Sequence, residues 1–286
     1  MQIADPAPVV VGVNGTAAGL AAARLGAREA VIRGKPLRIL HVFAWPGRRS
    51  SNDPPDYCSA RHDAELIVRE AENSAARSVP GVRVEGLLVD GDPVRELLRR
   101  TRTADLLVLG DDNLASRSRL PLDSLLVQTV AHARCPVVVA RGVRPPSGPL
   151  MAAVDGSASS LAALRLAAAE ACRRQVALEV VHAVPGPGGV PAGRRLLDTA
   201  MAACPGLTAA RSRVLVGDPA PTLVRASRRA RMMIVGPRGT DGGSLFGAVA
   251  GELLRRCACP TLFVHGNPAE DGPGTGTVPT AGTLMS

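Results

Sequence analysis

The amino-acid sequence repeats itself once, with short motifs of the first half recurring in the same order in the second half. The matched stretches are residues 11–16 and 152–157, 91–93 and 217–219, 108–110 and 234–236, and 135–139 and 259–263. A repeat this long exceeds the units of solenoid proteins and indicates two tandem domains of one fold. Polar positions at which the two copies differ therefore carry most of the functional information.

The spacing of matched residues shows where the copies differ in length. The offset is 141 residues from His41 to His182, 126 from Gly110 to Gly236, and 124 from Cys135 to Cys259. The second copy is thus 15 residues shorter before its Gly-Asp-Pro turn and 2 residues shorter before its Cys-Pro strand. We assign residues 1–144 to the first domain, 149–266 to the second, and 267–286, rich in Gly, Pro and Thr, to a disordered tail.

Each copy alternates five short apolar runs with helical patterns. The runs are 9–13, 37–42, 82–89, 106–109 and 137–140 in the first copy, and 150–154, 177–184, 212–216, 232–235 and 261–264 in the second. Strands that are apolar throughout and alternate with helices form parallel sheets covered on both faces. The sequence therefore predicts an α/β protein of two tandem Rossmann-like domains, each a five-stranded parallel sheet with helices on both faces.

Two local patterns refine the predicted helices. Within residues 159–175, Leu161, Leu164, Ala168 and Ala171 recur at helical spacing and predict one buried face. Each Gly-Asp-Pro turn places an Asp at a helix N-cap and a Pro at the first helical position, where these residue types are favoured.

Composition excludes several classes of function. The net charge of +9 comes from arginine, because Lys35 is the only lysine, and without a Gly-Lys-Ser/Thr motif there is no P-loop. The arginines are spread over both copies on predicted solvent-facing helix positions. Three Phe, one Trp and one Tyr are too few for base-stacking platforms, so nucleic acid is not expected as a partner. No His or Cys cluster has metal-ligand spacing.

The sequence also bears on location. No apolar run reaches the ~18 residues that a membrane span needs, and the N-terminal residues lack the basic and apolar regions of a secretory signal. None of the six cysteines forms a Cys-x-x-Cys pair. We therefore expect free thiols, a cytoplasmic location and no membrane partner.

The motifs in combination resemble the universal stress protein family. In the second copy they are Asp-Gly-Ser at 155–157 after the first strand, His182 closing the second, Gly-Asp-Pro at 217–219, Gly-x-x-Gly at 236–239, and Cys-Pro at 259–260. The resemblance covers about residues 8–142 and 149–266. It implies an intramolecular pseudo-dimer in which the fifth strands, 137–140 and 261–264, lie near each other. The Arg and Ala bias is similar to that of proteins from GC-rich actinobacteria.

Many members of that family bind ATP, while others bind no nucleotide. A glycine-rich turn leading into a helix presents backbone N–H groups that suit phosphate. The resemblance places Asp155 and Ala183 at the adenine end of an ATP site in the second copy, and it places around the phosphates Gly236, Arg238, Gly239, Gly247, Ala248 and Val249. Seven residues separate Gly239 from Gly247 where the family has nine, and Ala248 replaces the expected Ser or Thr.

The first copy departs further from the family pattern. Asn14 replaces the adenine-end aspartate, Asn113 replaces the second glycine, and Asp123-Ser124 replaces Gly-Ser. Asp111, Asp112 and Asp123 would face a polyphosphate with like charge. We interpret the first copy as a degenerate domain that does not bind nucleotide.

Two hypotheses for the function follow. The first is a cytoplasmic stress-response module that binds ATP or another adenine nucleotide in its second domain and acts on an unidentified protein partner. The alternative is a nucleotide-free interaction protein of the same fold, and a homodimer is compatible with both. An enzyme is not expected, because no motif places a serine elbow, a general base or a metal-holding carboxylate pair. His41 and His182 are interpreted as histidines satisfied at strand ends.

Overall fold

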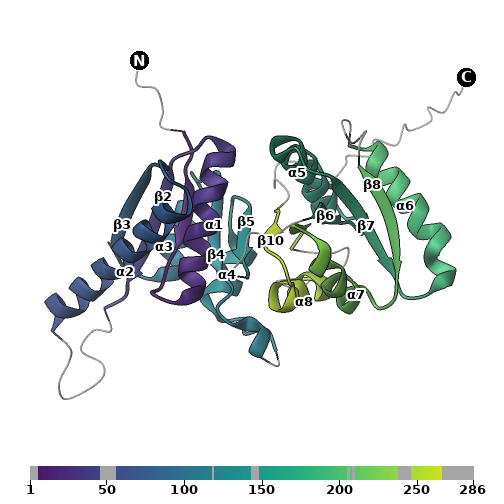
Figure 1. Ribbon diagram of the computed structural model, residues 1–286. Coiled ribbons are helices and arrows are strands. Elements are labelled where there is room, and N and C mark those ends of the chain that lie inside the picture. Colours follow the sequence, from purple (N-terminus) through teal and green to yellow (C-terminus); the bar gives the residue numbers. More distant parts are fainter. Residues whose placement is uncertain are drawn as a thin grey trace, which may run out of the picture.

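The ten strands of the protein form one continuous sheet in the order β3-β2-β1-β4-β5-β10-β9-β6-β7-β8 (Figure 1). The computed structural model describes residues 6–45, 56–117, 119–142, 148–204, 207, 210–237 and 246–265. The expected tail, 267–286, lies outside this described part, and so do residues 145–147 between the two assigned domains.

The first half contains five parallel strands and four α-helices. In chain order they are β1 (Val9–Gly12), α1 (Ala17–Arg33), β2 (Leu37–Phe43), α2 (Tyr57–Ser78), β3 (Val84–Asp90), α3 (Pro93–Arg100), β4 (Leu106–Gly110), α4 (Leu125–His132) and β5 (Val137–Ala140), with a 3-10 turn, η2, at Leu114–Ser116.

The second half repeats this order. It consists of β6 (Leu150–Ala153), α5 (Ala158–Arg174), β7 (Leu178–Val184), η3 (Pro187–Gly189), α6 (Val190–Ala202), β8 (Arg211–Val216), α7 (Pro219–Ala226), η4 (Ser227–Arg229), β9 (Met232–Val235), α8 (Ala248–Arg256) and β10 (Thr261–Phe263). The predicted fold class is confirmed, with strand ends within two residues of the apolar runs.

The two halves meet through their fifth strands, as expected. β5 and β10 pair antiparallel, with Thr261 opposite Val139, Leu262 opposite Val138, and Phe263 opposite Val137. Val138 and Leu262 are equivalent positions of the repeat, so a pseudo-two-fold axis passes between them. The two five-stranded sheets thereby become one, and Figure 1 shows β5 and β10 at its centre.

Helices cover both faces of the sheet, and the core forms one layer on each face. One layer joins buried side chains of α1, α2, α5 and α6 to the sheet, while the other joins α3, α4, α7 and α8. Both layers run through both halves without interruption. No helix in the described ranges combines the length and apolar character that a membrane crossing requires.

The two Gly-Asp-Pro turns share the same backbone conformation at the glycine but differ in the hydrogen bonding of the aspartate side chain. Gly91 and Gly217 have φ of 149° and 136°, a region that favours glycine. Asp92 caps α3, since its side chain accepts a hydrogen bond from Arg95 N at 2.8 Å, as predicted. Asp218 occupies the N-cap of α7 without a side-chain capping bond, so only the first turn carries the full predicted cap.

A square of four buried charges joins α1 to α5 across the axis. Glu29 and Arg33 on α1 are the repeat equivalents of Glu170 and Arg174 on α5. Arg33 donates to Glu170 at 2.7 Å, and Arg174 donates to Glu29. These four side chains are at most 5% exposed. Each glutamate also pairs with the arginine four residues later on its own helix. The buried charges of each half are therefore shared between an arginine of that half and one of the other.

Two sequence expectations need correction at this point. The buried stripe of α5 includes Glu170 together with Ala163, Leu164, Ala167 and Ala171, whereas Leu161 and Ala168 are only partly buried. Some arginines are also not solvated, because Arg33 and Arg174 are buried in the square. The charged stripe escaped a hydrophobic-period analysis since its partners come from the other repeat.

Replacing Glu170 by Gln tests the square. The change keeps the side-chain size but leaves Arg174 with Glu29 alone and Arg33 with Glu29 and the partly exposed Asp105. Removing one partner of a buried ion pair costs about 3–5 kcal/mol. We expect Glu170→Gln to lower the free energy of unfolding in urea by about 3 kcal/mol.

The control is Glu85→Gln on the edge strand β3. Glu85 pairs with Arg38 at 2.7 Å, and its side chain is 55% exposed. An exposed pair contributes at most about 1 kcal/mol. Equal small losses for both variants would show that the square does not hold the halves together.

Candidate functional site

The strand order creates one crevice in each half. β1 lies between β2 and β4, and β6 lies between β7 and β9. After β3 and after β8 the chain returns to add its next strand on the other side of β1 or β6, so the strand order reverses there. Ligands of open parallel sheets bind beyond the carboxyl ends of strands at such a reversal. The two crevices are therefore the candidate sites.

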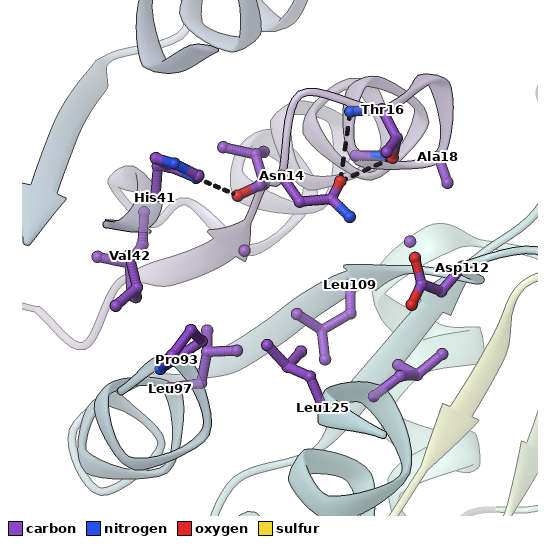
Figure 2. A pocket seen from close by; sticks show the side chains of 16 residues that line it. Asn14, Thr16, Ala18, His41, Val42, Pro93, Leu97, Leu109, Asp112 and Leu125 are labelled. Carbon is purple, nitrogen blue, oxygen red and sulfur yellow. Dashed lines mark hydrogen bonds between the residues drawn. The ribbon is translucent and has the colours of Figure 1, made fainter. Parts of the chain in front are cut away.

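The crevice of the first half contains a cavity of about 150 Å³. It is lined by residues at the ends of β1, β2 and β4 and near the starts of α1, α3 and α4, and Figure 2 shows these side chains around it. The lining is mainly apolar, with polar atoms from a few side chains. The apolar side chains include Leu40, Val42, Leu97, Leu109 and Leu125, and the polar ones are Asn14, Thr16, His41 and Asp112.

Two glycines of the first half shape this cavity. A Cβ on Gly12 would lie 2.7 Å from Leu109 Cδ2, and one on Gly19 would lie 2.9 Å from Asn14 Oδ1. The second half has Ala153 and Ser160 at the equivalent positions. The two halves consequently differ in side-chain volume at the end of the first strand and at the first turn of the following helix.

The residue that ends the first strand forms the same turn in both halves. Asn14 Oδ1 accepts hydrogen bonds from Thr16 N at 3.3 Å and Thr16 Oγ1 at 2.7 Å. Asp155 Oδ1 accepts from Ser157 N at 3.0 Å and from Ser157 Oγ. Each side chain therefore keeps one polar atom for other partners, an amide nitrogen in Asn14 and a carboxylate oxygen in Asp155.

Both histidines are satisfied by backbone, as expected. His41 Nδ1 lies 2.8 Å from Val13 O, and His182 Nδ1 lies 2.8 Å from Val154 O. A carbonyl oxygen only accepts, so Nδ1 carries the proton in each ring. No catalytic partner accompanies either ring in these contacts.

The glycine that follows the fourth strand is required by packing. A Cβ on Gly110 would lie 2.7 Å from the backbone of Ala18, and one on Gly236 would lie 2.5 Å from Ser159 Oγ. Glycine at these positions brings the end of the fourth strand against the first turn of the helix that follows the first strand, α1 or α5. The close approach itself shapes the crevice, independently of any phosphate.

The helix that follows the fourth strand begins differently in the two halves. Ser124 caps α4, with its Oγ accepting from Val127 N at 3.3 Å. Gly247 is the N-cap of α8 and provides no side-chain cap, and its N–H donates to Pro237 O at 3.0 Å. Phe246 is buried and packs edge-on against Phe263, with ring centroids 6.1 Å apart. The start of α8 is thus held against the exit of β9.

Six of the eight sequence-predicted site residues lie in the described part of the second half. Asp155 is exposed after β6, Ala183 is buried in β7, Gly236 follows β9, and Gly247, Ala248 and Val249 begin α8. Arg238 and Gly239 lie outside the described residues. Four of the predicted residues have equivalents in the first half that line its cavity together, namely Asn14, Val42, Gly110 and Leu125.

Two acidic residues near the first cavity differ in whether they form an ion pair. Asp111 pairs with Arg141, whose Nη1 lies 3.3 Å from its Oδ2 and whose Nη2 donates to Leu254 O in the second half. Burial lowers the pKa of Arg141. Within the described ranges Asp112 makes no ion pair, and no group of His, Cys, Asp or Glu is arranged to hold a metal ion.

Gly236→Ala tests the packing role of this glycine. The added methyl would collide with Ser159, and overpacking of this kind costs about 1–3 kcal/mol. We expect a lower free energy of unfolding by that amount in urea. Gly186→Ala is the control, because no atom lies within 4 Å of its added Cβ. Equal stability of the two variants would contradict the required close approach.

The comparisons with known proteins agree with the repeat. The sequence profile of the Universal stress protein family matches residues 7–141 and 147–265. A universal stress protein of Mycobacterium tuberculosis is 31% identical over 293 residues, which cover 90% of this chain and 96% of that protein. One of Mycolicibacterium smegmatis is 28% identical, covering 93% of this chain and 99% of its own.

Solved structures share the fold. A universal stress protein from Archaeoglobus fulgidus superposes with a TM-score of 0.72 at 17% identity, covering 91% of this chain and 98% of that one. Another from that organism, solved in complex with dAMP, covers 47% of this chain and 98% of its own at 19% identity and a TM-score of 0.37.

Proposed function

Because the chain belongs to the universal stress protein family over both halves, we propose that it is a cytoplasmic stress-response module that binds ATP in its second domain. It acts as a binding protein, and the nucleotide state of the second domain is communicated to a protein partner. The proposal concerns binding alone and requires no chemical step.

The observation that carries this proposal is the start of α8. No side chain in the described residues caps this helix, so the first backbone N–H groups, at Ala248 and Val249, are offered beside the exit of β9. The positive end of the helix dipole adds to their attraction for phosphate. In the first half the Ser124 side chain caps α4, accepting from Val127 N, the third amide of that helix.

Residues at the opposite end of the proposed site are compatible with recognition of an adenine ring. Asp155 keeps one carboxylate oxygen free of its own turn, and a carboxylate accepts hydrogen bonds from an exocyclic amino group. Ala183 is the equivalent of Val42, which lines the first cavity. Amino-group recognition at one end and phosphate at the other define an adenine nucleotide.

The variant Ala248→Asp tests ATP binding without destabilising the fold. A carboxylate in the first turn of α8 stabilises the helix by about 0.3–1 kcal/mol, but it repels phosphate. We expect calorimetric titration with ATP to give one site per chain for the wild type and no binding for this variant, with a Tm that is unchanged or higher.

Ser124→Asp is the matched control, because the repeat pairs position 124 with position 248. Asp caps helices as well as Ser does, and this variant should bind one ATP as the wild type does. Two sites per chain, or ATP binding that survives Ala248→Asp, would refute the assignment to the second domain.

Ala248→Ser restores the hydroxyl that the family pattern has at this position. A hydrogen bond to a charged group is worth about 1.5–3 kcal/mol, and ~1.4 kcal/mol is a factor of ten in affinity. We expect this variant to bind ATP about tenfold more tightly in the same titration. If neither protein binds ATP, the shortened loop closes the site and the proposal fails.

A further inference from the structure

The first-domain cavity has the size and lining of a site for one planar aromatic group. A cavity of about 150 Å³ with apolar walls accepts such a group. Leu40, Leu97, Leu109 and Leu125 come from four different elements and face this space. Figure 2 shows Leu97, Leu109 and Leu125 below the cavity and Asn14 above it.

Asn14 supplies a hydrogen-bond donor to this cavity. The backbone N–H of Thr16 can only donate, so the Asn14 atom that it meets is the oxygen Oδ1. The nitrogen Nδ2 is therefore left for a ligand, and Figure 2 shows it turned toward the cavity. Asp155, the equivalent residue, offers only an acceptor when ionised. The first domain thus favours a ligand ring with a hydrogen-bond acceptor facing Asn14. The second domain favours a ring with a hydrogen-bond donor facing Asp155.

The remaining walls disfavour phosphate. Asp112 lines the cavity and makes no ion pair with described residues, whereas the neighbouring Asp111 is neutralised by Arg141. The sequence has Arg238 at the position that the repeat pairs with Asp112, so the charge is reversed between the domains. In addition, the Ser124 side chain caps α4. A phosphate here would meet a carboxylate and a helix start that is already capped.

We propose that the first domain binds a phosphate-free heterocycle with a ring carbonyl, of the oxopurine base or nucleoside class. The ring lies between the leucines, its carbonyl accepts from Asn14 Nδ2, and ring N–H groups face Asp112. This site is separate from the ATP site of the second domain and does not depend on it.

Calorimetric titration of the full chain with inosine and with inosine monophosphate tests this site. We expect inosine to bind at one site per chain and the monophosphate to bind about tenfold more weakly, because its charge opposes Asp112. Asp112→Asn should remove this difference by strengthening binding of the monophosphate.

Asn14→Asp tests the donor. The second domain carries Asp at this place in the same turn, so the variant retains a turn that the fold accepts. It should bind inosine at least about tenfold more weakly and prefer adenosine. Asp155→Asn, the matched change in the second domain, should leave inosine binding unaltered.

Three results would overturn the proposal: no inosine binding, a monophosphate that binds as tightly as inosine, or an Asn14→Asp variant with unchanged preference. Inosine binding to the Ala248→Asp variant distinguishes the two sites, since that change removes only the ATP site. Loss of ATP binding with retained inosine binding would leave this inference intact.

Discussion

The exchange of buried charges between α1 and α5 is the constraint on which the two-domain arrangement depends. Glu29 and Glu170 are each almost fully buried, and a buried carboxylate without a partner is strongly unfavourable. Each is paired both with the arginine four residues later on its own helix and with an arginine of the other repeat. Together with the antiparallel pairing of β5 and β10, this exchange commits the two halves to one continuous sheet.

This shared scaffold allows the two crevices to differ without loss of the fold. The glycines at 110 and 236 make the same close approach in both halves, so the position of each crevice is fixed by backbone packing. The halves differ instead in the polar residues at equivalent positions of the repeat. Asn14 corresponds to Asp155, and Asp112 corresponds to Arg238. One family fold therefore presents different polar groups at equivalent places in its two halves.

Much of the fold could be predicted from the sequence, because the repeat and its apolar runs are local signals. The pairing of β5 with β10 followed from the family resemblance. The charge square was missed because Arg33 and Glu170 are 137 residues apart, and a helical period treats both as solvent-facing. The repeated Glu-x-x-x-Arg at 29–33 and 170–174 was the signal that could have revealed it.

The site was harder to predict for a different physical reason. Motif reasoning reads Gly236 as a phosphate ligand, whereas its lack of a side chain is already required by Ser159. The same reasoning treats loss of the Gly-x-x-Gly motif in the first half as loss of a site. The cavity there depends instead on Gly12 and Gly19, which lie outside that motif.

The central claim is that the two domains of one chain have diverged to hold different ligands at the same time. Native mass spectrometry of the intact chain with ATP and inosine present together tests it most directly. The account predicts a complex that contains one ATP and one inosine per chain. A chain that carries two ATP molecules, or ligands that displace each other and never bind together, would contradict it.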